Sequence, residues 1–249
     1  MRVGICLQGG GAKGAFQAGV IKAIFENEQI KNNIYSISGT SIGAINGYYI
    51  YTNNVDNIGE VWTNIDENTS NNINIIHNTV DNSQVIDLLK LLNQDNKKDI
   101  NYYVNYVEVN NQNVVEKIVN LKEIDTNESF EYIRYSALLP FNPQSKLSFR
   151  EQFILDVKKG IYEGYKLDGG MLNNTLIKPL IEDNLDKIII ISTSKTYRLP
   201  NEIIEHNKGK IVIVNPMTEY KHTDTLNFTK EFCTKAFEEG YHVGKEIKL

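Results

Sequence analysis

The order of apolar and polar residues predicts alternating strands and helices in the N-terminal part of the chain. A short apolar run, Val3–Leu7, is typical of a buried strand. It leads into a glycine-rich stretch and then into residues 15–28, where Phe16 and Val20 begin an apolar stripe at helical spacing. Residues 34–38 form a second β-favouring run, followed by an Ala/Ile/Tyr-rich segment able to continue as a buried helix. The pattern therefore predicts two consecutive units of strand, turn and helix.

The rest of the chain continues in the same manner. Further strands are predicted at residues 102–110, 114–121, 153–157, 161–167, 187–193 and 210–215, and further helices at 85–92, 130–139 and 227–245. The first two strands read as a hairpin or as neighbours, and the first helix is amphipathic, so it either covers core or acts as a lid. With no internal repeat and no linker-like segment, the 249 residues are predicted to form a single α/β domain, 1–249.

Composition narrows the class of protein. An apolar content of 41% with 23% charged residues is ordinary for a soluble globular chain, and the net charge of −5 argues against general nucleic-acid binding. Cys6 and Cys233 are too few for a disulfide framework and too far apart to suggest a metal-ligand pair, so we expect reduced, buried cysteines. Without a secretory signal or an apolar run of about 18 residues, we expect a cytoplasmic protein with at most transient, peripheral membrane contact.

Residues 39–43 read Gly-Thr-Ser-Ile-Gly, which has the Gly-x-Ser-x-Gly form of a nucleophile elbow. A strand enters this turn and a helix leaves it, so Ser41 is the candidate nucleophile. Glycine is required at positions 39 and 43 for a steric reason, because a side chain two residues before or after Ser41 would crowd the sharp turn. The amides and dipole at the start of the following helix favour negative charge developing beside Ser41.

The glycine-rich stretch after the first strand allows two interpretations. Gly9, Gly11 and Gly14 satisfy Gly-x-Gly-x-x-Gly, a pattern that can hold the pyrophosphate of a dinucleotide at a helix N-terminus. No acidic residue closes the second strand to bind a ribose, however, because that strand runs into the serine elbow. Alternatively, Gly10 and Gly11 present free amides to an oxyanion, with Lys13 in a supporting position. The nearby elbow favours the oxyanion hole.

An elbow serine needs a base, and two arrangements are compatible with the sequence. The four histidines are His77, His206, His222 and His242. Of these, His206 and His222 have the chain order expected of a Ser-Asp-His triad, but both lie in polar stretches typical of exposed loops. The other arrangement is a dyad in which Asp168 takes the serine proton, with Gly169 and Gly170 leaving its carboxylate room to approach.

Together, residues 9–14, 39–43 and 168–170 resemble, in order and spacing, the three motifs of the patatin-like phospholipase family. Ser136-Ala137-Leu138-Leu139-Pro140, Asn173-Asn174 and Gly240-Tyr241 extend the resemblance over most of the chain outside residues 53–128. One departure is Lys13, where the family usually has an arginine able to make a forked contact. The resemblance implies a three-layer α/β/α sandwich with a central, mostly parallel sheet.

The resemblance further implies a serine lipid acyl hydrolase, an esterase of the phospholipase A or lysophospholipase type. Ser41 would attack the ester, Asp168 would act as its base, and the amides of Gly10, Gly11 and Ile42 would hold the oxyanion, without metal or cofactor. Two alternatives stay open. One is a protein of the same fold whose role is interaction or delivery into another cell, with a latent esterase activity. The other is a dinucleotide-binding protein that uses residues 9–14. Oligomeric state is not predicted.

Overall fold

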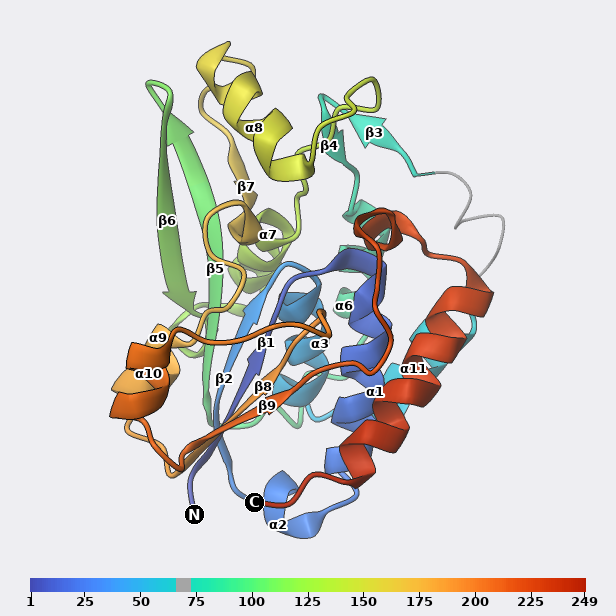
Figure 1. Cartoon of the computed structure of the whole chain (residues 1–249), viewed down its shortest axis with the longest axis vertical. Coiled ribbons are helices and arrows are strands. Elements are labelled where there is room, and N and C mark those ends of the chain that lie inside the picture. The colour runs from blue at the N-terminus through green and yellow to red at the C-terminus, as the bar shows by residue number, and fades with distance from the viewer. Residues whose placement is uncertain (66–72) are drawn as a thin grey trace.

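The computed structural model describes residues 1–65 and 73–249, and its centre is a mixed sheet (Figure 1). The strands are β1 (Val3–Leu7), β2 (Ile34–Thr40), β5 (Asn101–Asn110), β6 (Asn113–Asn120), β7 (Lys166–Asp168), β8 (Lys187–Ile191) and β9 (Ile211–Val214). Their order is β6-β5-β2-β1-β8-β9, with β7 paired to β5 off this path. Neighbouring strands from β5 to β9 are parallel, whereas β6 and β7 run antiparallel to β5. The predicted, mostly parallel sheet is therefore confirmed.

Helices cover both faces of this sheet (Figure 1). They are α1 (Gly14–Ile24), α2 (Glu28–Lys31), α3 (Ile42–Tyr51), α4 (Ile58–Thr63), α6 (Ser83–Lys90), α7 (Thr126–Ser136), α8 (Phe149–Lys158), α9 (Lys178–Glu182), α10 (Asn201–His206) and α11 (Lys230–Lys245). Short 3₁₀ helices are η1 (Gly11–Lys13), η2 (Val55–Asn57), η3 (Leu121–Glu123), η4 (Gly169–Met171) and η5 (His222–Leu226). A separate two-stranded sheet pairs β3 (Ile75–Ile76) with β4 (Thr79–Val80). No helix among the described residues is long and apolar enough to cross a membrane.

Side chains of the central strands alternate between two cores. On β1, Ile5 and Leu7 pack into the larger core, which includes residues of α1, α3 and α11, while Cys6 faces the opposite core with residues of α9. On β8, Ile189 and Ile190 alternate in the same way. Because successive strand residues point to opposite faces, a strand between two helical layers must be apolar throughout. This explains the unbroken aliphatic runs and confirms the three-layer sandwich.

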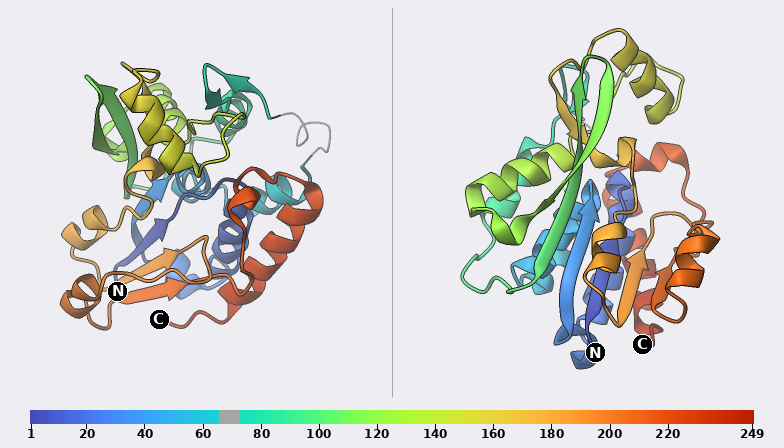
Figure 2. Two further views of the ribbon diagram at one scale, coloured as in Figure 1. Left: turned by 45° about the horizontal axis from the view of Figure 1, so that its top comes forward. Right: turned by 90° about the vertical axis from the view of Figure 1, so that its left-hand side faces the viewer.

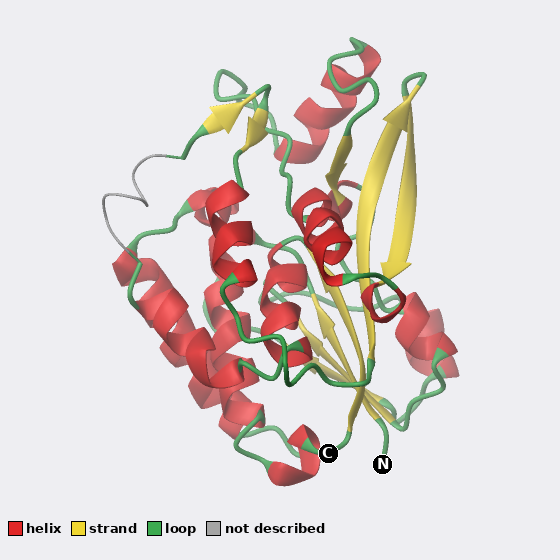
Figure 3. Cartoon of the chain, turned by 180° about the vertical axis from the view of Figure 1, so that it is seen from behind, coloured by secondary structure: helices red, strands yellow, loops and turns green. Residues whose placement is uncertain are grey.

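β5 is longer than its parallel neighbours and pairs with two strands in succession along one side. Its first half, Asn101 to Asn105, pairs with β2, and its next residues, Tyr106 to Glu108, pair with β7. The hairpin of β5 and β6 thus extends beyond the ends of β1 and β2, where it meets α8 and β7 (Figures 2 and 3). β2 and β7 approach each other end to end along β5, and this meeting point is where the site lies.

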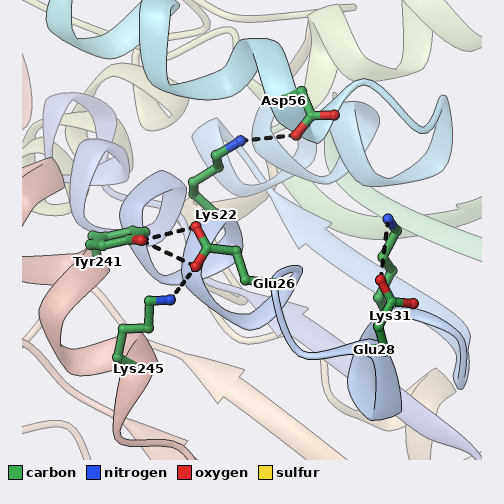
Figure 4. A network of polar contacts seen from close by, with 7 residues as sticks. All are labelled: Lys22, Glu26, Glu28, Lys31, Asp56, Tyr241 and Lys245. Carbon is green, nitrogen blue, oxygen red and sulfur yellow. Dashed lines mark hydrogen bonds and ion pairs between the residues drawn. The ribbon is translucent and has the colours of Figure 1, made fainter.

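α1 and α11 pack with almost no space between their backbones. A Cβ atom placed on Gly19 would lie 2.0 Å from the carbonyl oxygen of Phe237, and one on Gly240 would lie 2.0 Å from that of Phe16. Only glycine permits this approach. At the far end of α1, the Glu26 carboxylate pairs with Lys245 and accepts hydrogen bonds from the Tyr241 hydroxyl at 2.9 and 3.1 Å (Figure 4). The terminal helix thereby supports the helix that begins at the glycine loop.

Two strand predictions in the second half of the chain are wrong. Residues 153–157 belong to α8, which begins at a capping box between Ser148 and Glu151 and buries Phe153 and Val157 at helical spacing. Of residues 161–167, only the last two belong to a strand, because Gly160 and Gly164 turn the chain with φ of 73° and 79°. The helix predicted at 15–28 ends at Ile24. The strands predicted at 102–110, 114–121, 187–193 and 210–215, and the other helices, are present with shifted ends.

Candidate active site

Ser41 occupies a strained turn between β2 and α3. Its φ of 56° and ψ of −123° lie outside the regions that L-residues favour. A Cβ atom on Gly39 would lie 2.5 Å from the carbonyl oxygen of Gly43, and a Cβ on Gly43 would lie 2.3 Å from that of Leu7. The glycines at both ends therefore let α3 fold back tightly over the ends of β1 and β2. The amide of Ser41 donates a 2.9 Å hydrogen bond to Ser136 Oγ, which helps to hold the strained turn.

Asp168 ends β7 as a buried carboxylate, with 3% of its surface exposed. Its Oδ1 accepts a 2.7 Å hydrogen bond from the amide of Gly170. Burial raises the pKa of Asp168 to about 6, although hydrogen bonding from the Ser41 side chain and the Gly170 amide opposes the rise. Asp168 is therefore close enough to the Ser41 hydroxyl to be influenced by it, and it is more basic than an ordinary aspartate.

β5 brings these two residues together. Thr40, the last residue of β2, pairs with Asn105, and Asp168, the last residue of β7, pairs with the next residue, Tyr106. The buried Asn105 side chain reinforces the junction: its Oδ1 accepts from Thr40 Oγ1 at 2.8 Å, and its Nδ2 donates to the carbonyl of Asn173 at 2.9 Å. Both the elbow and the loop after Asp168 are thus attached to one side chain.

Glu116 on β6 fixes the orientation of that asparagine. Its Oε1 accepts from Asn105 Nδ2 at 2.7 Å and from Asn173 Nδ2 at 3.0 Å. With its donor group directed to Glu116, the amide of Asn105 must turn its oxygen toward Thr40. Neither Asn105 nor Glu116 belongs to a recognisable motif. Their one sequence signal is a polar residue within strand runs that are otherwise largely apolar.

The glycine loop is held by hydrogen bonds to its carbonyl groups. Gly9 O accepts from Asn174 Nδ2 at 3.1 Å and from Thr193 Oγ1 at 2.8 Å. Gly11 has a φ of 57°, and a Cβ atom there would lie 2.0 Å from the carbonyl oxygen of Thr225. A side chain at this position would therefore collide with η5, whatever its rotamer.

The predicted oxyanion donors lie in this loop and at the start of α3. Within residues 1–65 and 73–249, the amides of Gly10, Gly11 and Ile42 donate no hydrogen bond to the protein. All three residues line the cavity that also contains Ser41 and Asp168. Free amides beside a nucleophile are what an oxyanion hole requires. Gly14 lies behind them at the start of α1, where a Cβ atom would lie 2.5 Å from Ile42 Cγ1.

Buried polar side chains behind the loop were not predicted from the sequence. Gln17 Nε2 donates to the carbonyl oxygens of Gln8 at 2.7 Å and Ile191 at 3.1 Å. Asn46 Nδ2 donates to Gly14 O at 2.9 Å, and Trp62 Nε1 donates to Asn46 Oδ1 at 3.0 Å. This network ties α1, α3 and α4 to the loop. It rigidifies the residues around the free amides, since buried polar groups need partners.

The cavity has a volume of about 1150 Å³, above the usual range for small-molecule sites. Its apolar lining comes from several separate elements and includes Ile45, Trp62, Val80, Leu88, Leu139, Phe149, Met171 and Phe228. Ser41, Asp168 and other polar residues line it as well. Lys13 also lines the cavity; burial lowers the pKa of its ammonium, and Asp224 opposes that shift. The arrangement suits a ligand with a long apolar part and one polar reacting group.

The histidines differ in their relation to this cavity. His206 ends α10 as an exposed residue, with Nδ1 2.6 Å from the carbonyl oxygen of Glu202, and it does not line the cavity. His222, although exposed, does line it and stacks on Phe149 with 4.8 Å between ring centroids. His222 is therefore the one predicted alternative base that borders the cavity.

The described residues contain no group of three or more histidine, cysteine or acidic side chains able to hold a metal ion. Cys6 and Cys233 are buried free thiols, as expected, and burial raises the pKa of each to about 12. Such thiols are poor nucleophiles at neutral pH. Neither thiol lines the cavity, whereas Ser41 and Asp168 both do.

A strained serine, a buried aspartate and a glycine loop with free amides thus line one cavity. The family model of patatin-like phospholipases matches residues 5–181, and the chain belongs to that family. Residues after 181 still contribute to the same sheet, because β8 lies between β1 and β9. No curated protein matches the chain.

Three solved structures are similar to this chain. VipD from Legionella pneumophila is 13% identical, with a TM-score of 0.48; the match covers 98% of this chain and 66% of VipD. The ExoU–SpcU complex of the Pseudomonas aeruginosa type III secretion system matches with 14% identity, a TM-score of 0.40 and coverage of 97% and 52%. A second structure, of type III effector protein ExoU, matches with 10% identity, a TM-score of 0.38 and coverage of 98% and 53%. The chain thus spans about half to two thirds of the length of these proteins.

Proposed function

We propose that this protein hydrolyses acyl esters of lipids through a dyad of Ser41 and Asp168. The observation that carries the proposal is the meeting of two strand ends on β5, which brings a strained serine beside a buried carboxylate whose pKa is raised to about 6. A base with a pKa near the working pH is largely ionised there and still accepts a proton readily. Membership of the patatin-like phospholipase family supports a hydrolase.

In the acylation step, Asp168 takes the proton of Ser41 Oγ while that oxygen attacks the ester carbonyl carbon. The carbonyl oxygen becomes an oxyanion, and the amides of Gly10, Gly11 and Ile42 are positioned to stabilise it. The bond to the alcohol part of the ester then breaks, and Asp168 returns the proton to the departing oxygen. The product of this half-reaction is an acyl group on Ser41.

Deacylation repeats the same chemistry with water. Asp168 removes a proton from a water molecule, whose oxygen attacks the acyl carbonyl, and the same amides hold the second oxyanion. Collapse of this intermediate releases the fatty acid, and the proton returns from Asp168 to Ser41 Oγ. The net reaction consumes one ester and one water and gives one acid and one alcohol, with the dyad restored.

The cavity supports a lipid as the source of the ester. Side chains such as Ile45, Leu88, Leu139 and Phe228 give it apolar walls, and a ligand with an acyl chain would bury apolar surface against them. We propose no metal in the reaction, because polarisation of the ester is assigned to backbone amides. Hydrolysis should therefore continue in excess EDTA, and a loss of activity that Ca²⁺ or Zn²⁺ restores would contradict the dyad.

The test is turnover of p-nitrophenyl esters by the purified chain, together with labelling by a fluorophosphonate probe. Ser41→Ala should abolish both turnover and labelling, whereas Asp168→Asn should abolish turnover while the fold remains intact. Thr218→Ala, in an exposed loop away from the cavity, is a matched control and should behave as the wild type. Full activity in either the Ser41→Ala or the Asp168→Asn variant would refute the proposed mechanism. If the pure protein turns over only after another factor is added, the alternative of a latent esterase in an interaction protein gains support.

A further inference from the structure

α8 carries apolar side chains on both of its faces. Its inner face packs Phe153 and Val157 into a small core. On its outer face, Ile154 and Leu155 are 48% and 41% exposed, and Leu147, just before the helix, is 47% exposed. A surface helix normally presents polar residues to water. An exposed apolar face of this kind marks a place where the protein contacts something else.

The apolar surface continues from α8 onto neighbouring segments. A second, smaller cavity of about 170 Å³ lies between α8 and the hairpin, and its lining includes Ile154, Val114 and Leu172. Leu172 is itself 42% exposed. Ile154 therefore belongs to an apolar region formed by three separate parts of the chain, rather than standing alone on the surface.

Basic residues lie on α8 and immediately beside it in the chain. They are Lys146, Arg150, Lys158 and Lys159, and within residues 1–65 and 73–249 none of them has a carboxylate within 4 Å. The nearby carboxylates form hydrogen bonds with other groups. Glu151 accepts from Ser148 at the start of α8, and the buried Asp156 accepts from Gln152. The chain as a whole has a net charge of −5.

The patch borders the large cavity. Ser148, Phe149 and Arg150, at the beginning of α8, line that cavity, and Arg150 also lines the small one. α8, the hairpin tip and the β3–β4 sheet lie at the same end of the molecule (Figures 1 and 3). The hydroxyl of Tyr162 donates to the carbonyl of Asn78 at 2.8 Å and connects α8's following turn to β3–β4. A surface bound to this end would thus lie beside the cavity that leads to Ser41.

We propose that this patch is the surface through which the protein docks on an anionic lipid bilayer. We define the docking face as Leu147, Ile154, Leu155 and Leu172 with Lys146, Arg150, Lys158 and Lys159. Apolar side chains that enter the interface and cations that attract anionic headgroups are the two signals that together give stable peripheral binding. Interfaces between proteins are instead depleted in lysine. The inference deepens the proposed function, on which it rests, by naming the form in which the substrate is presented.

The experiment separates binding from catalysis by using the full chain with Ser41→Ala. Flotation with phosphatidylcholine vesicles should be weak, and flotation with vesicles that also contain phosphatidylserine should be strong and should fall as salt is added. Replacing Lys158 and Lys159 by glutamine should weaken binding about 30-fold, because each lysine near an anionic surface contributes about 1 kcal/mol. Ile154→Asn with Leu155→Asn should weaken it about tenfold or more.

Matched controls come from α10 and the turn that follows it, on another side of the molecule (Figure 1). Lys208→Gln removes an exposed lysine, and Ile204→Asn alters a side chain that is 37% exposed, so neither should change vesicle binding. Equal losses in these controls would overturn the docking face. So would equal binding to both vesicle types, or binding insensitive to salt, and these two outcomes need no variant to fold. A wild-type dimer in solution that becomes monomeric with Ile154→Asn and Leu155→Asn would reassign the face to a second copy of the chain.

A soluble short-chain ester distinguishes the two proposals. For this test the Lys158→Gln, Lys159→Gln variant keeps the native Ser41. It should hydrolyse the soluble ester as the wild type does and lose activity on anionic vesicles. Hydrolysis of the soluble ester without any vesicle binding would refute the docking face and leave the dyad standing. Vesicle binding without hydrolysis of any ester would refute the dyad and leave the docking face standing.

Discussion

Replacing Asp168 by asparagine should make the protein inactive and, at neutral pH, more stable. The folded protein raises the pKa of Asp168 from 3.8 to about 6 because it buries the carboxylate. A shift of one unit corresponds to about 1.4 kcal/mol, so the ionised carboxylate destabilises the fold by about 3 kcal/mol. Asparagine is uncharged and nearly the same shape, and its oxygen can still accept from the amide of Gly170.

The pH dependence gives the direction of this effect. Between pH 3.8 and about 6 the folded state binds more protons at Asp168 than the unfolded state does, so the stability that this residue contributes falls as pH rises. The gain in the free energy of unfolding from Asp168→Asn should therefore be absent below about pH 4 and should reach its full size above about pH 7. For a chain of this length, about 3 kcal/mol corresponds to a rise in Tm of about 6 to 12 °C.

The measurement is urea and thermal unfolding of wild type and Asp168→Asn at pH 8 and near pH 4.5, with ester turnover measured in parallel. Turnover should fall by about 100-fold or more, which is the usual contribution of a general base. A buried charged group that serves catalysis can lower the stability of the folded protein, so neutralising it is expected to raise that stability. An Asp168→Asn variant less stable than the wild type at pH 8, or a stability difference independent of pH, would refute the reasoning.

Three further predictions concern the same site. The value of kcat/KM should decrease as pH falls through about 6, where Asp168 is protonated. His206→Ala and His222→Ala should keep both this pH profile and most of the rate. Loss of turnover in either variant would favour a triad with that histidine as the base. Ser136→Ala removes the acceptor for the amide of Ser41 and should lower kcat about tenfold with little change in KM, and an unchanged kcat would exclude a positioning role. Gly11→Ala should abolish turnover or lower Tm by several degrees, since its Cβ collides with Thr225.

The sequence was most informative where the backbone itself is constrained. The elbow around Ser41 and the loop at Gly11 need glycine for steric reasons, so their pattern is visible without any knowledge of tertiary structure. Asp168 is predicted because the two glycines after it complete, with residues 9–14 and 39–43, a set of three motifs in order. The role of these residues in catalysis stays a prediction, whereas their placement around one cavity is an observation.

Residues that act through tertiary contacts were not found from the sequence. Asn105 and Glu116 meet the loop after Asp168 only because β5 pairs with β2, β6 and β7, and nothing local in either strand indicates this. α8 was assigned to a strand because a short apolar run has no decisive period. The capping box between Ser148 and Glu151 was the overlooked sign of a helix.

The pairing of two strand ends with consecutive residues of β5 also determines where this sequence is free to change. An insertion at Asn111, at the tip of the hairpin, would lengthen a solvent-exposed turn and leave Asn105 and Tyr106 in register. An insertion of a single residue before Asn105 would turn every later side chain of β5 to the opposite face and separate the partners of Thr40 and Asp168. A change of length is thus tolerated in the hairpin turn, whereas within the paired part of β5 it would separate the elbow from Asp168.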